Sequence, residues 1–180
     1  MIILASNSPR RKQLLAQITN EFIVIPSCID ETIFPIEEIA YQKGKEIYKN
    51  HPNDLIISAD TIVLFKNKIL TKPIDENDAR KTLSLLSNNT HEVITNYVIF
   101  YQKKIIKNSI ISKVTFNNLS NELIDKYIKS KSPLDKAGSY GIQDNEKYHL
   151  VKSYQGSLTN IIGLPLEEVK KTIIEIGYKI

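Results

Sequence analysis

Two short apolar runs with a helical stretch between them open the chain, and this pattern constrains the fold more than any other feature. Residues 2–5 and 22–25 are apolar enough to form buried strands. Residues 9–18, which lie between them, have the spacing of a helix. A strand, a helix and a second strand in succession are typical of α/β proteins, so we predict an α/β fold.

Hydroxyl and basic residues meet where this first helix begins. Ser8 can cap the helix, and Pro9 suits its first position because proline has no N–H to leave unbonded. The helix dipole adds roughly half a positive charge there. Arg10 and Arg11 carry planar forks that match phosphate oxygens. This combination predicts a phosphate site, although an ordinary capped helix with a solvated basic turn explains the same residues equally well.

The rest of the chain continues to alternate between helices and strands. Further helices are predicted over residues 36–49, 75–86 and 120–131, and after Pro165. Further strands are predicted over residues 55–60, resuming at 62–65, over 91–101 and 105–116 as a hairpin, and over 148–153. The loop at 133–143 contains two glycines, two charges and an amide. Loops of this length usually serve a function.

Length and composition limit the class of protein. The chain has 180 residues, enough for one substantial core, so we expect a single domain over residues 1–180, with room for two lobes. Met1 leads directly into an apolar strand without a basic leader, and no apolar run approaches the roughly 20 residues of a membrane span. Cys28 is the only cysteine, so no internal disulfide can form. We therefore expect a cytoplasmic protein without a membrane partner.

Charge and motif content exclude several functions. The net charge is +4, and the 24 Lys and Arg residues are scattered along the chain, which argues against an extended nucleic-acid-binding face. A small anion such as a nucleotide needs only a few cations at one site. The three histidines have no zinc-site spacing, and the chain lacks Gly-x-Ser-x-Gly, Walker and Rossmann patterns.

A few acids and one lysine are placed where chemistry could occur. Asp60 ends the strand predicted over 55–60, where a carboxylate could hold Mg²⁺ or polarise water, but capping a turn is an equally good interpretation. The neighbours Asp30 and Glu31 could bind a divalent cation or simply lead into the next helix. Lys72 precedes a proline in a rigid turn, and a solvated loop lysine is the commoner outcome there.

Five motifs in order resemble the Maf family of nucleoside triphosphate pyrophosphatases. They are Leu4-Ala5-Ser6-x-Ser8-Pro9-Arg10-Arg11, Ser58-Ala59-Asp60-Thr61, Lys72-Pro73, Asp135-Lys136-Ala137-Gly138-x-Tyr140-x-Ile142-Gln143 and Gly163-Leu164-Pro165. The resemblance implies a mixed, twisted sheet flanked by helices, with two lobes around a cleft, as in Maf proteins and inosine triphosphatases. It also implies hydrolysis of a nucleoside triphosphate to the monophosphate and pyrophosphate, dependent on Mg²⁺ or Mn²⁺.

The resemblance further points to the branch that hydrolyses dTTP and UTP. That branch has an arginine after Ser-Pro, a threonine after the central aspartate and a glutamine in the late loop, which correspond here to Arg10, Thr61 and Gln143. Ordinary and modified pyrimidine nucleotides would use the same residues. An amide suits a pyrimidine because it can donate to a carbonyl and accept from N3–H.

Roles for the remaining site residues also follow from the resemblance. Asp60 matches the family's proton acceptor, and with Glu31 it would hold the metal. The other substrate-binding residues implied are Ser8, Arg11, Lys43 and Lys72. Gly44 follows Lys43 where a helix would favour alanine by about 1 kcal/mol, which leaves the geometry of this lysine open.

The sequence is also compatible with two other functions. One is a non-enzymatic regulator of septum formation or a nucleic-acid-associated protein, which the scattered charge disfavours. The other is a phosphomonoesterase that uses the same anion site and releases inorganic phosphate. The resemblance is also compatible with a homodimer.

Overall fold

The computed structural model describes all residues, 1–180, as a mixed α/β protein. The strands are β1 Ile2–Leu4, β2 Phe22–Val24, β3 Leu55–Phe65, β4 Lys68–Leu70, β5 Thr90–Tyr101, β6 Lys104–Phe116 and β7 Val151–Gln155. The helices are α1 Pro9–Leu15, α2 Ile39–Asn50, α3 Glu76–Leu86, α4 Asn121–Lys129, α5 Asn145–Tyr148, α6 Leu158–Ile162 and α7 Leu166–Glu175. Short 3₁₀ turns are η1 Glu31–Ile33, η2 Ile36–Glu38, η3 Ser132–Asp135, η4 Ala137–Ser139 and η5 Ile142–Asp144.

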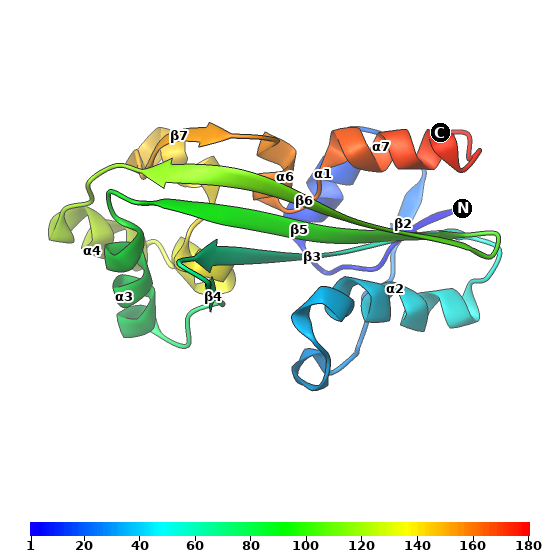
Figure 1. The fold of residues 1–180 in the computed structure, drawn as a ribbon, viewed down its shortest axis with the longest axis horizontal. Helices are drawn as coiled ribbons and strands as arrows, with labels where there is room; N and C mark the ends of the chain where they lie inside the picture. Colours follow the sequence, from blue (N-terminus) through cyan, green and yellow to red (C-terminus); the bar gives the residue numbers. More distant parts are fainter. The chain divides into compact units, whose positions relative to one another are not determined.

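All seven strands belong to one sheet, in the order β2-β1-β3-β5-β6-β7, with β4 paired to β3 (Figure 1). Strand β1 runs parallel to both β2 and β3, so that Ile3 pairs with Ile23 on one side and with Ile56 on the other. The pairs β3–β4 and β6–β7 are antiparallel. The predicted α/β class, with helices flanking a mixed sheet, is therefore confirmed.

The chain forms two compact units. The first contains residues 1–60, 95–110 and 163–180, and the second contains residues 61–94 and 111–162. Strands β3, β5 and β6 contribute residues to both units. No helix in the structure is both long enough and apolar enough to cross a membrane.

The core of the first unit lies where α2 packs on the sheet. Phe100 of β5 is 1% exposed, and its ring stacks between those of Tyr41 and Tyr48, with centroids 5.6 and 5.3 Å away. Ile47 of the same helix and Ile56 of β3 complete this contact. Ile39, Ala40 and Ile47, which belong to the apolar face predicted for this helix, are buried.

The core of the second unit combines α3 and α4 with the ends of β3, β5 and β6. Leu83 and Leu86 of α3 and Ile124 of α4 are almost completely buried, together with Phe116 of β6. Both helices begin with the predicted side-chain caps, since Asp75 accepts from the N–H of residue 78 and Ser120 accepts from that of residue 123. Local capping therefore fixed where each helix starts.

Several sequence predictions need correction. Strand β3 is continuous over Leu55–Phe65, so Asp60 lies in its middle and neither ends a strand nor caps a turn. The first helix ends at Leu15, before the predicted residue 18. Tyr148 belongs to the short helix α5 and not to the strand that follows it, and helix α6 was not predicted.

Candidate functional site

The basic turn at the start of α1, residues 8–12, has the geometry predicted for it. The Ser8 side chain accepts a hydrogen bond from the Arg11 backbone N–H at 3.4 Å, and so caps the helix. The Ser8 backbone N–H donates in turn to the hydroxyl of Ser6 at 3.2 Å. Pro9 stands at the first helical position, as expected. These contacts set the path of the chain into the helix.

The Arg11 side chain is held by two hydrogen bonds. Its Nε donates to the Gly163 carbonyl oxygen at 2.8 Å, and its Nη1 donates to Ser6 Oγ at 3.2 Å. Burial lowers the pKa of Arg11 below its usual value, while the carboxylates of Asp60 and Glu31 act to raise it. Because arginine starts from so high a pKa, the guanidinium keeps its charge at neutral pH. The result is an oriented cation beside two acids.

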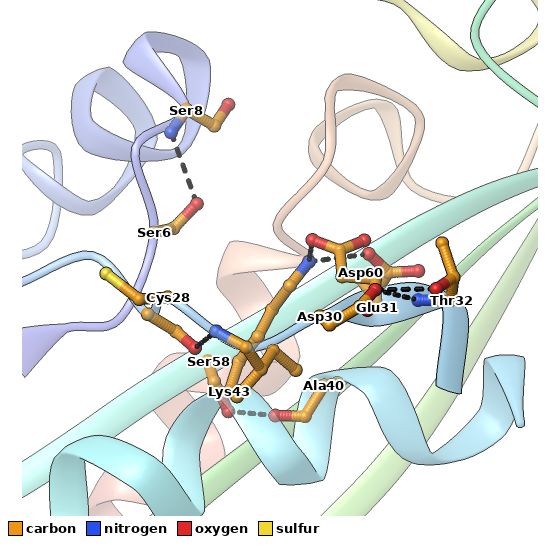
Figure 2. Close-up of polar contacts among 12 residues, drawn as sticks. Ser6, Ser8, Cys28, Asp30, Glu31, Thr32, Ala40, Lys43, Ser58 and Asp60 are labelled. Atoms are coloured by element: carbon orange, nitrogen blue, oxygen red, sulfur yellow. Dashed lines mark hydrogen bonds and ion pairs between the residues drawn. The ribbon is translucent and has the colours of Figure 1, made fainter. Parts of the chain in front are cut away.

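The two acids, Glu31 and Asp60, share one ammonium group. Lys43 Nζ lies 2.8 Å from Glu31 Oε1 and 3.0 Å from Asp60 Oδ1, as Figure 2 shows. The side chains of Lys43 and Asp60 are only 13% and 14% exposed, whereas that of Glu31 is 51% exposed. We call Glu31 and Asp60 the acid pair. The ammonium balances one of its two negative charges, which keeps the two carboxylates close together.

Different local structures place the two neighbouring acids Asp30 and Glu31. Asp30 caps the turn η1 by accepting from the Thr32 backbone N–H at 2.9 Å and from its hydroxyl at 2.6 Å. These hydrogen bonds lower the pKa of Asp30. Glu31 is the first residue of η1, and its side chain reaches Lys43 instead (Figure 2). Asp30 and Glu31 were expected either to bind a divalent cation or to lead into the next helix, and Asp30 has the second, structural role.

Gly44 explains how Lys43 reaches the acid pair. A β-carbon on Gly44 would lie 2.3 Å from Phe100 Cε2 and 2.5 Å from Ser58 Oγ, distances that atoms do not adopt. The Ser58 hydroxyl donates to the carbonyl oxygen of Ala40 at 2.7 Å, which ties α2 to β3 (Figure 2). The glycine thus allows the helix to lie directly on the strand that carries Asp60. Packing therefore requires a glycine at this position of the helix, in spite of its poor helix propensity.

The predicted site residues are divided between the two units. The first unit contains Ser8, Arg10, Arg11, Glu31, Lys43 and Asp60, and the second contains Thr61, Lys72 and Gln143. In the first unit the acid pair lies together with Lys43. The negative charges of both acids also act on Arg11, where they favour the charged guanidinium.

In the second unit, Lys72 and Gln143 are exposed and Thr61 is half-buried. Lys72 lies just beyond β4 and makes no ion pair with another protein group. The segment that carries it is tied to the late loop, because Gly138 N–H donates to the Thr71 carbonyl oxygen at 3.2 Å. The late loop is the stretch of residues 133–143 that also carries Gln143.

Two residues that hold Arg11 were not assigned a role from the sequence. Ser6 is 8% exposed, and its hydroxyl oxygen accepts from both Arg11 and the Ser8 backbone. Gly163 supplies only a carbonyl oxygen, and it lies 152 residues away in the chain. Both belong to the motifs that carried the family resemblance, which was the one signal that could have singled them out.

Comparison with known proteins agrees with that resemblance. The family described as Maf-like protein matches residues 1–176. The chain belongs to this family. A protein of Pyrococcus furiosus named dTTP/UTP pyrophosphatase is 44% identical over 99% of this chain and 96% of its own. A protein of Halalkalibacterium halodurans with the same name is 40% identical over 98% of this chain and 96% of its own.

A third Maf relative, from Clostridium botulinum, also bears the name dTTP/UTP pyrophosphatase. It is 39% identical over 98% of this chain and 97% of its own. The three matches each extend over almost the whole of both proteins, so both units described above belong to the shared Maf sequence. The resemblance inferred from the five motifs is confirmed at the level of the family.

Proposed function

We propose that this protein hydrolyses nucleoside triphosphates, with dTTP and UTP preferred, to the nucleoside monophosphate and pyrophosphate. The observation that carries the proposal is the acid pair bridged by Lys43, next to the oriented guanidinium of Arg11 in the same unit. A triphosphate carries close to four negative charges. Such a site supplies cations that can bind the phosphates and carboxylates that can hold a metal ion or accept a proton from water. Full-length relatives named dTTP/UTP pyrophosphatase support the choice of substrate.

Asp60 is the proposed proton acceptor. Its Oδ1 accepts from Lys43 at 3.0 Å, and its second oxygen has no donor from the protein. In the proposed reaction that oxygen takes a proton from water as the water oxygen bonds to the α-phosphorus. The bond from the α-phosphorus to the bridging oxygen breaks, and pyrophosphate leaves with that oxygen. The Lys43 ammonium holds Asp60 through its other oxygen, Oδ1, and so orients the carboxylate for its role as the base.

Phosphate binding is proposed for four residues. Arg11 is already oriented by the Gly163 carbonyl and Ser6, so little side-chain freedom is lost when it binds a phosphate oxygen. Arg10 adjoins it in the first turn of α1, where the helix dipole also favours an anion. Ser8 and Lys72 complete the proposed phosphate-binding residues. The contacts of Arg11, Ser8 and Lys72 do not depend on the base.

A divalent cation, Mg²⁺ or Mn²⁺, is the proposed cofactor, and the acid pair would hold it. Magnesium in proteins is commonly bound by one or two carboxylates together with substrate phosphates and water. Glu31 and Asp60 fit this pattern, since one ammonium within 3.0 Å of both already marks a place for positive charge between them. The chain has no group of three or more His, Cys, Asp or Glu side chains that could hold a metal ion, so at the acid pair substrate phosphates and water would have to supply the remaining ligands. When bound, the metal would neutralise phosphate charge and activate the attacking water.

Base selection is proposed for Arg10, Thr61 and Gln143. The Gln143 amide is exposed and can both donate and accept, which matches the O4 and N3–H edge of thymine and uracil. A base that does not present this edge to the amide in the same position would leave the amide incorrectly paired. A donor or acceptor that is buried in a complex without a partner reduces the binding free energy by about 1–3 kcal/mol.

The test is a nucleotide panel with Mg²⁺, with Mn²⁺ and with EDTA, followed by ³¹P NMR of the products. We expect pyrophosphate and the monophosphate from dTTP and UTP, slower turnover of ATP and 7-methyl-GTP, and none with EDTA. Inorganic phosphate as the first product would favour a phosphomonoesterase instead. No turnover of any nucleotide would favour a non-enzymatic septum regulator.

Two further expectations stay predictions. A homodimer would be tested by the mass in solution from light scattering. A cytoplasmic location would be tested by fractionation of cells that express the protein.

A further inference from the structure

A hydrogen-bond chain runs beneath the late loop of the second unit. The Lys136 ammonium donates to Ser132 Oγ at 2.9 Å, and the Ser132 hydroxyl donates to Asp144 Oδ2 at 2.6 Å. The Tyr127 hydroxyl donates to the same Asp144 oxygen at 2.7 Å, and it accepts from the Gly141 backbone N–H at 3.0 Å. We call the side chains of Lys136, Ser132, Asp144 and Tyr127 the relay.

The relay has only one possible direction of donation. An ammonium group can only donate and a carboxylate can only accept, so the hydroxyls of Ser132 and Tyr127 must both direct their protons to Asp144. Burial, followed by the hydrogen bond to Asp144, raises the pKa of Tyr127 above its usual value. Its hydroxyl therefore stays protonated over the whole physiological range. The donors and acceptors of the relay therefore fit together in a single arrangement.

Lys136 has no donor left for a ligand. Its three N–H groups are used by the Ser132 carbonyl oxygen at 2.6 Å, by the Ser132 hydroxyl, and by Asp135 Oδ1 at 2.7 Å. Its side chain is 13% exposed, whereas that of Asp135 is 60% exposed. The lysine therefore serves the loop itself and is not available as a phosphate-binding cation.

Gly141 brings the relay against Gln143. A β-carbon on Gly141 would lie 2.8 Å from Lys136 Cε and 2.9 Å from Gln143 Oε1. The lysine stem and the glutamine amide thus occupy the space beside a residue that has no side chain. Gln143 is exposed, so burial does not restrict its rotamers. The Gln143 amide thus lies close to Gly141, whose N–H is bound by Tyr127 of the relay, and on the same side as the stem of Lys136.

We propose that the relay and Gly141 are positioning residues that hold the Gln143 amide ready for the base. This inference rests on the proposed function, because it assigns a purpose to the residue proposed to read the base. An exposed glutamine that is confined by fixed neighbours loses less rotamer freedom on binding than an unconfined one, so the correct base gains more from it. The relay should then affect selectivity between bases and not the hydrolytic chemistry.

The test uses Tyr127→Phe and Ser132→Ala, each of which removes a hydroxyl from the relay, with Tyr148→Phe as the matched control. The Tyr148 ring packs on that of Tyr127 with centroids 4.8 Å apart and is 6% exposed, but its hydroxyl belongs to no part of the relay. The first readout is the kcat/KM ratio of dTTP to ATP. We expect Tyr127→Phe and Ser132→Ala to lower that ratio by about three- to tenfold, mainly through KM for dTTP. Tyr148→Phe should leave the ratio unchanged.

A second background shows whether the effect passes through Gln143. In Gln143→Ala, adding Tyr127→Phe should lower the ratio no further, since the amide being positioned is already gone. A purely structural loss would lower the thermal midpoint equally in both backgrounds and would not move the ratio. Full additivity of the two losses in selectivity would overturn the proposal.

A third readout needs no activity. The side-chain NH₂ signals of Gln143 in a ¹⁵N–¹H spectrum are assigned by their absence from Gln143→Ala. We expect them to move toward unfolded-peptide positions in Tyr127→Phe and Ser132→Ala but not in Tyr148→Phe. Unchanged signals would overturn the positioning role. Absence of pyrophosphate production by the wild type would overturn the proposed function instead, while this spectrum still decides whether the relay positions Gln143.

Discussion

Gly44→Ala sets helix propensity against packing, and the structure predicts which effect is larger. Alanine is favoured over glycine in a helix interior by about 1 kcal/mol, so the local effect of the change is stabilising. The new methyl group would meet Phe100 Cε2 at 2.3 Å and Ser58 Oγ at 2.5 Å. The Phe100 ring cannot easily retreat, because it is stacked between Tyr41 and Tyr48.

The packing loss should exceed the propensity gain. Inserting a methyl into a filled core typically destabilises by about 1–3 kcal/mol, and a fully enclosed site such as this one lies at the upper end. Subtracting the gain of about 1 kcal/mol leaves a net loss near 2 kcal/mol in the free energy of unfolding. Helix α2 would also be pushed away from β3, which lengthens the 3.0 Å contact between Lys43 and Asp60. Turnover should therefore fall together with stability.

Urea unfolding followed by circular dichroism measures the stability, and pyrophosphate release measures the turnover. Phe100→Leu in the same chain provides a matched test, since a smaller side chain relieves the closest contact. The double variant should lose less stability than the sum of the two single losses. A Gly44→Ala protein that is about 1 kcal/mol more stable than wild type would refute the reasoning, because it would mean that propensity alone decides.

Four other predictions concern the proposed site and the core. Asp60→Asn should fold normally but lose about a hundredfold or more in turnover, since the amide cannot accept the proton, and normal turnover would contradict the assignment. Arg11→Ala and Lys72→Ala should each raise KM and lower turnover for every nucleoside triphosphate to the same extent, whereas base-dependent losses would contradict a phosphate-binding role. Gln143→Glu should reduce activity on dTTP and UTP more than on guanine nucleotides, and an unchanged preference in a substrate panel would contradict the proposed base contact. Burial lowers the pKa of His91 to about 4, below that of an unfolded histidine at about 6.5, so the folded state binds fewer protons between these values. The contribution of His91 to stability should be constant above about pH 6.5 and fall by up to about 3 kcal/mol toward pH 4, and His91→Gln should remove this part of the fall in urea titrations at several pH values.

The elements that the sequence predicted well are those with strong local signals. The apolar run at residues 2–5 lies between two parallel partners, and the caps at Ser8, Asp75 and Ser120 each accept the backbone N–H expected of them. The hairpin between β5 and β6 turns at Gln102 and Lys103, which adopt positive φ. Caps and hairpin turns depend on a few neighbouring residues, so they can be predicted without knowledge of the fold.

Asp60 shows where local signals fail. An acid followed by a threonine interrupts an apolar run, and so the strand was predicted to stop there. In the structure β3 continues past both residues, because the Lys43 ammonium compensates the carboxylate in the middle of the strand. That lysine is 17 residues away, so no pattern within the strand could have indicated it. The role of Gly44 was equally hard to predict from the sequence, because the side chain that requires a glycine there is the ring of Phe100 on another element.

The sequence by itself determined the α/β class, most helix and strand positions, the basic turn at α1 and, through five ordered motifs, membership of the Maf-like family. Only the tertiary structure decided that Lys43 bridges Glu31 and Asp60, that Gly163 orients Arg11, and that a one-directional relay underlies the late loop. The physical reason is the range of the interactions. Caps and apolar periodicity act over a few residues, whereas the placement of charged groups depends on which distant atoms the folded chain brings within about 3 Å.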